Sequence, residues 1–511
     1  MGEEMKTESK KPDSARSELA MKYFQAEYGH FINGEWVGGS SSEKIAMINP
    51  ANLEVLSYIQ SGNAEDVNRA VEAATQAFPK WSRSTPSERQ AALYEMARRL
   101  RARANDYAAM LSLDNGKPIM EALHIDIPAT IGQFELFAGA AFGLHGQTID
   151  ATQGVAIIHR EPLGVVAQII PWNVPLVMMA TKIAPALAAG NTIVLKPAES
   201  VCLAVMEFIR EMADLLPPGV LNVITGYGPN VGEALVTHPN VRKVAFTGSR
   251  PTAQKLMQYA SVNVIPQTLE LGGKSANIIC ADADMDAAAE SAAMSIVVNK
   301  GEICFAATRH FVHESVMDAF VEKVQNILRK IRVGDPMIPS TQMGPQASRM
   351  QFDKVLGYLD IGRNEGATTA MGGKRATVSG FEQGYFIEPT LFTDVRNKMR
   401  IAQEEIFGPV GVVIPWKDEA QVIREANDTE FGLAAGLWTK NITQAHRMAR
   451  EIEAGTVWVN RYFNTIPNVP FGGYKQSGFG REFSLDVLSH YTQLKSVIVS
   501  LQEGPIGLFD H

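Results

Sequence analysis

The sequence predicts an α/β protein that contains a doubly wound parallel sheet, a second α/β domain and a small β element. Three observations support this fold class. Short, apolar, β-rich runs alternate with helical stretches from about residue 160 to 300, the same alternation resumes from 310 to 460, and Leu494–Leu501 alternates partly between apolar and polar residues. Strands that alternate with helices are typical of parallel βαβ units. The 511 residues are enough for two to four domains.

The elements before residue 160 are a strand pair and a group of helices. Phe31–Val37 is predicted to form two strands joined by a turn at Asn33-Gly34, because an Asn-Gly pair favours a tight hairpin turn. Residues 64–112 show the spacing of small and apolar positions that is typical of helices. Thr85-Pro86 marks a helix start, since Pro is favoured at the first helical position.

The region from 160 to 300 is predicted to contain several buried strands with helices between them. The predicted strands are Val165–Ile170, Thr192–Leu195, Val220–Ile224, Lys243–Phe246 and Asn277–Ile279, and the helices include Leu203–Leu216 and Gly232–Val236. The strand at Leu494–Leu501 either completes the sheet of another subunit or is an ordinary edge strand.

Composition excludes several classes of protein. The 47 basic and 55 acidic residues give a net charge of −8, which disfavours a nucleic-acid binder. No apolar run reaches the length of a membrane span. Glu, Lys, Asp and Arg recur through the first twenty residues without an apolar core, which excludes a secretory signal and predicts a disordered charged tail over residues 1–25.

Cysteine usage points to a reducing compartment. Only Cys202, Cys280 and Cys304 occur, so the chain is no disulfide scaffold and a cytoplasmic location is expected. The ten histidines are scattered without zinc-type spacing, so no metal is expected. Neither a G-x-S-x-G nor a P-loop motif is present.

Two glycine-rich turns follow predicted strands and are candidates for binding a phosphate. Gly226–Gly232 follows Val220–Ile224, and Phe246–Ser249 ends the next strand. Glycine lets a backbone approach a pyrophosphate closely, and helix N–H groups then receive it. Neither turn has the full G-x-G-x-x-G pattern, and turns of this kind are often only connections.

Cys304 is either a buried small hydrophobic residue or a nucleophile. Its neighbours Asn299, Gly301 and Glu302 are polar or small and predict the entry from a loop into a helix. A helix N-terminus lowers the pKa of a thiol, which favours the nucleophile. Cys202 and Cys280 lie in apolar patterns and are expected in the core.

Two further polar residues have a structural and a chemical interpretation each. Glu270 stands between leucines and before paired glycines, where burial would raise its pKa toward that of a general base, or it is a partly exposed residue at a strand end. Asn173 lies between Pro171 and Pro175, where its amide either donates to a developing oxyanion or closes a local turn.

The motifs in their order along the chain strongly resemble the NAD(P)-dependent aldehyde dehydrogenase superfamily and, within it, the hydrolytic aldehyde dehydrogenases. The resemblance extends from about residue 30 to 500. It rests on Cys304 and on six motifs, namely Pro171-Trp-Asn-Val-Pro175, Lys196-Pro-Ala-Glu199, Phe246-Thr-Gly-Ser249, Leu269-Glu-Leu-Gly-Gly-Lys274, Glu404-Glu-Ile-Phe-Gly-Pro409 and Pro470-Phe-Gly-Gly-Tyr-Lys-Gln-Ser-Gly478.

The resemblance implies a catalytic set. Cys304 is the nucleophile that forms a thiohemiacetal, and Asn173 stabilises the oxyanion. Glu270 activates the water that hydrolyses the later thioester. Lys182 and Glu482 match positions that relay the proton away from this glutamate.

The resemblance also implies that NAD binds, with NADP the less favoured alternative because a carboxylate at Glu199 repels a 2′-phosphate. The implied cofactor contacts are Ile169, Trp172, Lys196, Glu199, Gly228, Phe246, Ser249, Leu271, Gly272, Gln351, Glu405 and Phe407. One departure from the family pattern stands beside them. Ala253 replaces a usual glycine after Arg250-Pro251, and Arg250 beside the phosphates is expected to weaken the preference for NAD.

The implied substrate positions are mostly apolar and indicate a wide tunnel for an uncharged aliphatic or aryl-alkyl aldehyde. They are Val174, Met178, Thr181, Val298, Ile303, Phe305, Phe463, Thr465 and Phe471. Arg461 keeps open a semialdehyde that bears a carboxylate, and oxidation to a CoA thioester is a second alternative. A non-catalytic member of the fold is a remote third, because both Cys304 and Glu270 are present.

The expected domain organisation follows from the resemblance and the alternation of elements. A Rossmann-like NAD-binding domain takes residues 26–143 and 163–272, and a catalytic domain takes 273–476. A β oligomerisation element takes 144–162 and 485–511 and implies a homodimer or homotetramer. The partners expected are a small-molecule aldehyde and copies of the chain, with neither nucleic acid nor membrane.

Overall fold

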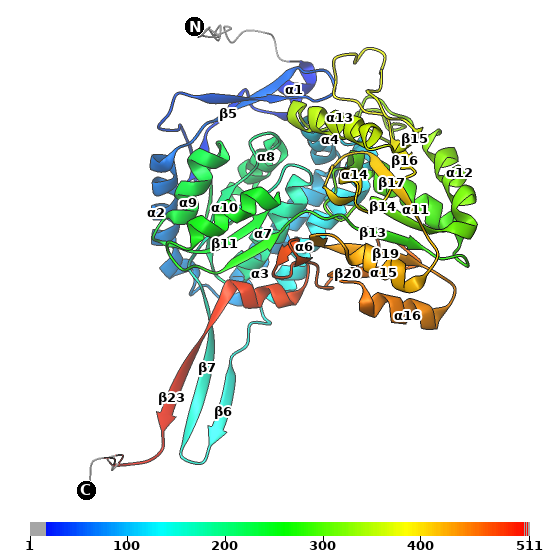
Figure 1. Cartoon of the computed structure of the whole chain (residues 1–511). Coiled ribbons are helices and arrows are strands. Elements are labelled where there is room, and N and C mark those ends of the chain that lie inside the picture. Colours follow the sequence, from blue (N-terminus) through cyan, green and yellow to red (C-terminus); the bar gives the residue numbers. More distant parts are fainter. Residues whose placement is uncertain (1–16, 505, 507, 509–511) are drawn as a thin grey trace, which may run out of the picture.

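Two largely parallel sheets organise the computed structural model, which describes residues 17–504, 506 and 508 (Figure 1). Over that part of the chain, the first sheet has eight strands in the order β22-β12-β11-β8-β9-β10-β2-β3, and the second has seven in the order β15-β16-β17-β14-β13-β19-β20. The predicted α/β class with a doubly wound sheet is therefore confirmed.

The first sheet contains a parallel block flanked by antiparallel strands. The block is β12 (Gln267–Glu270), β11 (Val241–Thr247), β8 (Val165–Ile169), β9 (Thr192–Lys196) and β10 (Leu221–Val223). The flanking strands are β22 (Gly478–Phe479), β2 (His30–Ile32) and β3 (Glu35–Val37). The chain order of the block reverses between β8 and β11, and ligands of open α/β sheets bind outside the carboxyl ends of the strands at such a point.

Helices cover both faces of this sheet because its buried strands alternate their side chains between two cores. Val166 and Ile193 face one core and Val165 and Val194 the other. The first core includes residues of α3 (Pro86–Ala102), α4 (Ala104–Asn115), α6 (Ile127–Ala140), α7 (Pro175–Ala188) and α8 (Leu203–Met212). The second includes residues of α2 (Ala64–Trp81), α9 (Glu233–Thr237) and α10 (Arg250–Ala260).

The second sheet is built in the same way. Its strands are β15 (Thr368–Met371), β16 (Thr390–Thr393), β17 (Val410–Trp416), β14 (Arg309–His313), β13 (Ala276–Ile279), β19 (Ala434–Trp438) and β20 (Thr456–Val459). One of its cores draws on α11 (Met285–Val297) and α12 (Met317–Leu328). The other draws on α13 (Arg349–Asn364), α14 (Arg400–Gln403), α15 (Glu419–Asn427) and α16 (Ile442–Glu451).

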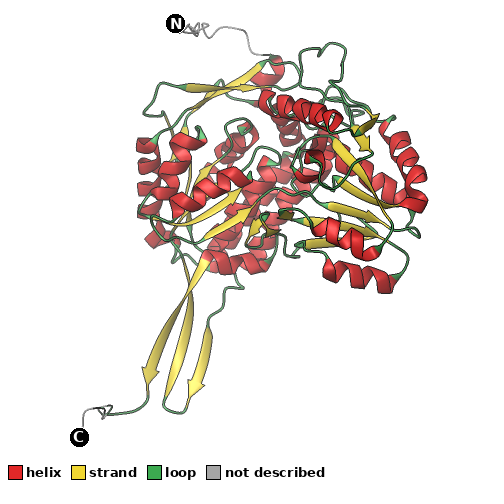
Figure 2. Cartoon of the chain, in the orientation of Figure 1, coloured by secondary structure: helices red, strands yellow, loops and turns green. Residues whose placement is uncertain are grey.

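A three-stranded arm projects from the body of the molecule (Figure 2). It consists of β6 (Gln147–Ala151), β7 (Gly154–Pro162) and β23 (Thr492–Ser500). β6 and β7 form a hairpin, and β23 pairs with β7, more than 300 residues earlier in the chain. Two small sheets complete the fold. One contains β1 (Glu27–Tyr28), β5 (Val55–Gln60) and β4 (Lys44–Ile48), and the other contains β18 (Phe431–Gly432) and β21 (Tyr474–Lys475). The short helix α5 spans Ile119–Glu121. The domain boundaries and the pairing role of the arm stay predictions.

The local signals in the sequence determine several element ends. Thr85 caps α3 and forms a capping box with Glu88, as the Thr85-Pro86 signal predicts. Asn33 and Gly34 adopt positive φ angles of 55° and 85° in the turn between β2 and β3. The helices predicted within 64–112 are present as α2, α3 and α4.

The expectation of a disordered tail over residues 1–25 is wrong for residues 17–25. Glu18–Tyr23 form α1, capped by Ser17, and Ala20 and Phe24 are buried against the first core. Two well-placed apolar contacts outweigh the charged composition around them. Residues 1–16 lie outside the described part of the chain.

Burial places two of the cysteines as expected. Cys202 and Cys280 lie in separate cores, while Cys304 is only partly buried. Within residues 17–504, 506 and 508, the helices are all too short or too polar to cross a membrane.

Candidate active site

Cys304 lies on an irregular loop between α11 and β14. A 3₁₀ turn at Val298–Gly301 follows α11, and Cys304 stands in the next turn, before β14 begins at Arg309. The expected entry into a helix is therefore wrong, since Cys304 follows a helix and does not begin one. The prediction of a polar loop is confirmed, but the loop follows a helix and does not lead into one.

The surroundings of Cys304 keep its sulfur protonated. The thiol donates to Glu270 Oε1 across 3.6 Å. Burial raises the pKa of the Cys304 thiol well above its ordinary value, and the carboxylates of Glu270 and Glu405 raise it further. The expected lowering of this pKa by a helix N-terminus is therefore wrong, and a base must remove the proton before the sulfur becomes nucleophilic.

Glu270 is the base within reach. It ends β12 and is 4% exposed, which rules out the alternative of a partly exposed strand-end residue. Burial raises the pKa of Glu270 to about 8, and the neighbouring Glu482 carboxylate adds to this, while Lys182 opposes it. Thr247 donates to its second oxygen at 3.4 Å.

Lys182 and Glu482 form a buried ion pair behind Glu270. Lys182 Nζ, from α7, lies 2.6 Å from Glu482 Oε1, on the loop that follows β22. The structure therefore brings four of the predicted catalytic residues together from α7, β12 and two loops. Two adjacent carboxyls and one ammonium can hold and pass on a proton.

The Asn173 amide reaches the loop of the nucleophile. Its Nδ2 donates to the Glu302 carbonyl at 2.9 Å, across 129 residues of sequence. That long-range bond places the side chain beside the Cys304 loop, which favours the oxyanion role over the local turn. The structure describes no other protein acceptor for this nitrogen among residues 17–504.

Several of the predicted cofactor residues lie at the switch point of the first sheet. Ile169 ends β8, Phe246 is the second-to-last residue of β11, and Ser249 is the N-cap residue of α10. The Ser249 hydroxyl bonds to Thr252 at 2.9 Å and accepts no hydrogen bond from a backbone N–H of the helix, so the N–H groups of Arg250 and Thr252 stay available to an anion. Gly228 is half-buried and begins the π-helical turn Gly228–Gly232 after β10, two strands away from β8.

Lys196 and Glu199 form an ion pair at the end of β9. Lys196 Nζ bonds to Glu199 Oε2 at 3.0 Å, and Glu199 stays partly exposed. A carboxylate fixed in this way can accept a hydrogen bond from a sugar hydroxyl.

The remaining predicted cofactor residues converge between the two sheets. Glu405 Oε1 accepts from the Gly273 N–H at 3.0 Å, and a Cβ on Gly272 would meet the Glu405 oxygens at 2.2 Å. Trp172 and Phe407 pack edge to face with centroids 5.4 Å apart. Gln351 holds this loop by donating to the Phe407 carbonyl at 2.5 Å, and Leu271 donates its N–H to Ser477 at 3.0 Å.

Arg250 does not stand free beside this edge. Its guanidinium bonds to the Glu430 carboxylate and to Gln476 Oε1, the latter at 2.9 Å. The charge expected to weaken the preference for NAD is therefore paired. Ala253 is buried in the second core of this sheet, so the small side chain keeps the close packing of helix on strand that a glycine would allow.

Aromatic rings surround the residue next to the nucleophile. Phe305 has ring neighbours at centroid distances of 5.8, 5.5 and 5.4 Å, and these are Trp458, Phe463 and Phe471. Phe471 is also joined to the relay, because its backbone exchanges two hydrogen bonds with Glu482. The sequence reasoning missed Trp458, whose only signal is an aromatic residue at a strand position.

The other predicted substrate residues lie on or just before α7, near Cys304, and on the loop that follows β20. Met178 and Thr181 are buried on α7, and the Thr181 hydroxyl donates back to Val177 at 2.8 Å. Val174 precedes α7, Val298 begins the 3₁₀ turn, and Ile303 precedes Cys304. Thr465 lies near Phe463, with a backbone bond of 3.0 Å, and Arg461 is exposed on the same loop.

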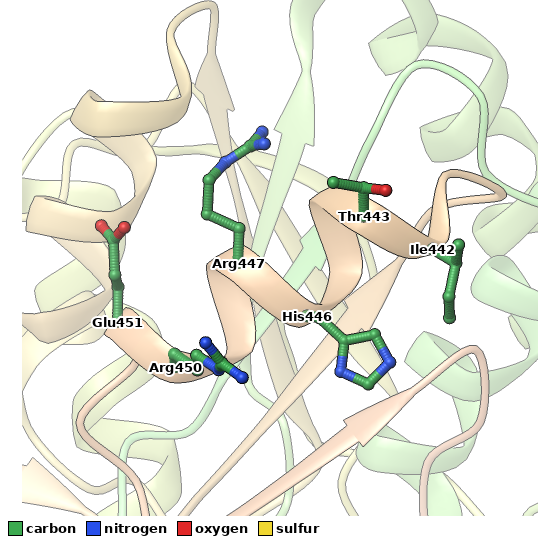
Figure 3. Close-up of a pocket in the computed structure, with 6 residues that line it drawn as sticks. All are labelled: Ile442, Thr443, His446, Arg447, Arg450 and Glu451. Carbon is green, nitrogen blue, oxygen red and sulfur yellow. The ribbon is translucent and has the colours of Figure 1, made fainter.

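A surface depression over α16 lies apart from these residues (Figure 3). It is lined by Ile442, Thr443, His446, Arg447, Arg450 and Glu451 from one face of one helix. Arg447 is already paired with Glu419 at 2.7 Å. Within residues 17–504, 506 and 508, no cluster of three or more His, Cys, Asp or Glu residues has the arrangement of a metal site.

Comparisons with known proteins match nearly the whole chain to one family. The family model described as "Aldehyde dehydrogenase family" matches residues 36–497. An aldehyde dehydrogenase of Deinococcus radiodurans is 44% identical and aligned over 95% of each chain. The NAD+ complex of an aldehyde dehydrogenase from Bacillus cereus has a TM-score of 0.92 and 41% identity, with 96% of this chain and 99% of that chain covered. The complex of a mutant P. syringae indole-3-acetaldehyde dehydrogenase with NAD+ and IAA has a TM-score of 0.91 and 41% identity, covering 94% and 98%.

Proposed function

Because the chain belongs to the aldehyde dehydrogenase family, we propose that it oxidises an uncharged aldehyde to the carboxylic acid with NAD+, without coenzyme A. The observation that carries this proposal is the 3.6 Å contact between the Cys304 thiol and Glu270, whose pKa is raised to about 8. A nucleophile beside a tunable base serves both acyl formation and hydrolysis.

The residues at the switch point fit NAD+. The uncapped first turn of α10 suits a pyrophosphate, the Lys196–Glu199 pair suits a ribose, and Glu405 lies on the side of Cys304. NAD+ supplies the hydride acceptor when bound. Glu199 carries the preference for NAD over NADP, because its carboxylate repels a 2′-phosphate.

In the proposed reaction, Glu270 takes the proton of the Cys304 thiol, and the sulfur attacks the aldehyde carbon to give a thiohemiacetal. The second N–H of Asn173 stabilises the oxyanion together with the Cys304 backbone N–H. Glu270 passes the thiol proton on to the adjoining Glu482–Lys182 pair and is a carboxylate again before hydrolysis. After oxidation, it removes a proton from the water that hydrolyses the thioester on Cys304. Glu482 and Lys182 then receive that proton, since their ion pair adjoins Glu270.

The aromatic cluster around Phe305 favours an aryl-alkyl substrate. Rings at 5.4 to 5.8 Å around the residue next to Cys304 offer stacking and edge contacts to an aromatic group. The P. syringae relative is named for an aldehyde of this kind. Arg461 is the one residue of this loop that favours a semialdehyde with a carboxylate, as the second candidate.

The test is a panel of aldehydes compared by kcat/KM, which measures discrimination directly. We expect NADH and free acid without coenzyme A, and a ratio highest for phenylacetaldehyde, lower for acetaldehyde and lowest for succinate semialdehyde. Cys304→Ala must abolish both products. Acid formation that requires coenzyme A, or turnover that survives Cys304→Ala, would overturn the proposal.

We further propose that the arm of β6, β7 and β23 joins copies of the chain into a homodimer or homotetramer. Its outer residues include large apolar side chains that are open to solvent in the single chain, among them Leu494 at 63% and Ile498 at 79% exposure. Exposed apolar strands of this kind are typical of protein interfaces.

A further inference from the structure

A wholly buried lysine lies under the loop that carries the nucleophile. Lys300 Nζ donates to Asn115 Oδ1 at 2.6 Å and to the Asn115 carbonyl at 3.0 Å, and it pairs with Glu302 Oε2 at 2.9 Å. Two hydrogen bonds and one ion pair thus surround the ammonium group. Neither Lys300 nor Glu302 is exposed, so both charges depend on this geometry.

The backbone at Lys300 is held in an uncommon conformation. Asn299 and Lys300 both have left-handed angles, with φ of 46° and 60°. Gly301 follows at φ 73°, where a Cβ would meet the Gly408 carbonyl at 2.1 Å. Non-glycine residues persist in this region only where their surroundings fix them, and they gather at functional sites.

The partners of Lys300 connect it to Asn173 by two routes. Glu302, whose Oε1 accepts from the Ala347 N–H at 3.0 Å, presents its carbonyl to Asn173 Nδ2 at 2.9 Å. Asn115 donates to the Trp172 carbonyl at 3.0 Å and so holds the peptide that precedes Asn173. The ammonium therefore fixes both the acceptor of the Asn173 amide and the backbone that carries it.

Asn299 closes the network from the other side. Its Nδ2 donates to the Asn173 carbonyl and to the Glu302 carbonyl, each at 3.0 Å, and its N–H donates to the Glu121 carboxylate at 2.9 Å. One N–H of Asn173 is thus used inside the network. The direction of the second N–H follows from it, because an amide group is planar.

We propose that Lys300, through Glu302 and Asn115, is a positioning residue that aims the Asn173 amide at the oxyanion formed on the substrate of Cys304. This rests on the proposed function and adds a residue to it that touches neither substrate nor cofactor. Oxyanion stabilisation depends on donors that are held in place before the reaction. The network supplies that constraint with a charged group, which a neutral residue of the same length lacks.

The test is Lys300→Met, which keeps the length of the side chain and removes its charge. The rate of the first NADH burst should fall about 10- to 100-fold, within the roughly 10²- to 10³-fold that loss of an oxyanion donor itself produces. The KM for the aldehyde should change less than twofold, since the substrate is not touched. Asn173→Ala should lower the same burst rate by at least as much.

The decisive measurement is the double variant Lys300→Met/Asn173→Ala. If Lys300 acts through Asn173, the double variant is no slower than Asn173→Ala alone. A role in stability alone would leave the two losses multiplying. Binding of NAD+ by fluorescence titration should be unchanged in every variant, which separates this result from a failure of the proposed reaction.

The control for general destabilisation is Glu207→Gln. It removes the charge of a buried carboxylate, which pairs at 2.5 Å with the partly exposed Arg210 and has no contact with Asn173. It should lower Tm but leave the burst rate unchanged. Lys300→Gln is the second variant if the methionine protein does not fold. An unchanged burst rate in a folded Lys300 variant, or multiplying losses, would overturn the proposal.

Discussion

Glu482 accepts a 2.6 Å bond from Lys182, and the same carboxyl group faces Glu270 inside the protein. The two carboxyls resist ionising together, because like charges this close repel. Burial, with the Glu482 carboxyl beside it, raises the pKa of Glu270 to about 8, so the proton stays on Glu270 until the pH approaches that value. Part of this shift comes from a partner 212 positions away in the sequence.

The first prediction concerns Glu482→Gln. Glu270 works as a base only when deprotonated, so the hydrolysis rate should rise with pH through an apparent pKa of about 8. Removing the negative charge at 482 lowers the pKa of Glu270, because that charge helps to raise it. The rising limb of the kcat profile should move to lower pH.

Lys182→Met is the opposing control for that shift. It removes the positive charge that lowers the pKa of Glu270, so its limb should move to higher pH. A shift of both variants in the same direction would contradict the proposed coupling.

The second prediction separates the two duties of Glu270. Glu270→Gln removes the base that lies 3.6 Å from the Cys304 thiol, so the cofactor-free protein should react more slowly with iodoacetamide at pH 7.5. Steady-state turnover should fall about 10²- to 10⁴-fold, because the base for hydrolysis is lost. Intact mass and NADH release measure the two effects.

The matched control for Glu270→Gln is Glu404→Gln. Glu404 is only partly buried, and Arg400 and Tyr358 bind its carboxylate. It should change neither quantity. Faster alkylation in Glu270→Gln would contradict the role of the Glu270 carboxyl as the base for the thiol.

The third prediction concerns the choice between NAD and NADP. Glu430→Gln releases the Arg250 guanidinium, which follows directly after the N-cap residue of α10. A freed cation at that place attracts a phosphate, so the ratio of kcat/KM for NADP to that for NAD should rise by about 5- to 20-fold, which corresponds to a gain of roughly 1–2 kcal/mol. Glu430→Gln/Arg250→Gln should return the ratio to that of the original protein.

The fourth prediction concerns the arm. Ile498→Glu places a charge on the outer face of β23, so light scattering after gel filtration should give the mass of one chain, while the original protein gives two or four. Ile442→Glu is the matched control, because Ile442 is 67% exposed on α16, away from the arm. Association that survives Ile498→Glu would contradict pairing through this face.

Residue order determined most of the fold and the identity of the reacting groups. The strands that alternate with helices, the turn at Asn33-Gly34 and the start at Thr85-Pro86 are local patterns, and each is present in the structure. The family motifs named Cys304, Glu270, Asn173, Lys182 and Glu482, and the fold brings these residues into one place. The prediction that a helix begins at Cys304 is wrong, because polar residues such as Asn299 and Glu302 occur after the end of a helix as readily as at its start.

Only the three-dimensional structure determines the protonation states of those groups and the positions of the charges that influence them. The sequence gives no distance between Lys182 and Glu482 or between Lys300 and Asn115, which lie 300 and 185 residues apart. The pKa of a carboxyl and the direction of an amide depend on burial and on charges within a few ångströms. Only the folded chain brings those together, so the family resemblance could name the nucleophile, but the protonation of its thiol and the network under its loop could not be predicted.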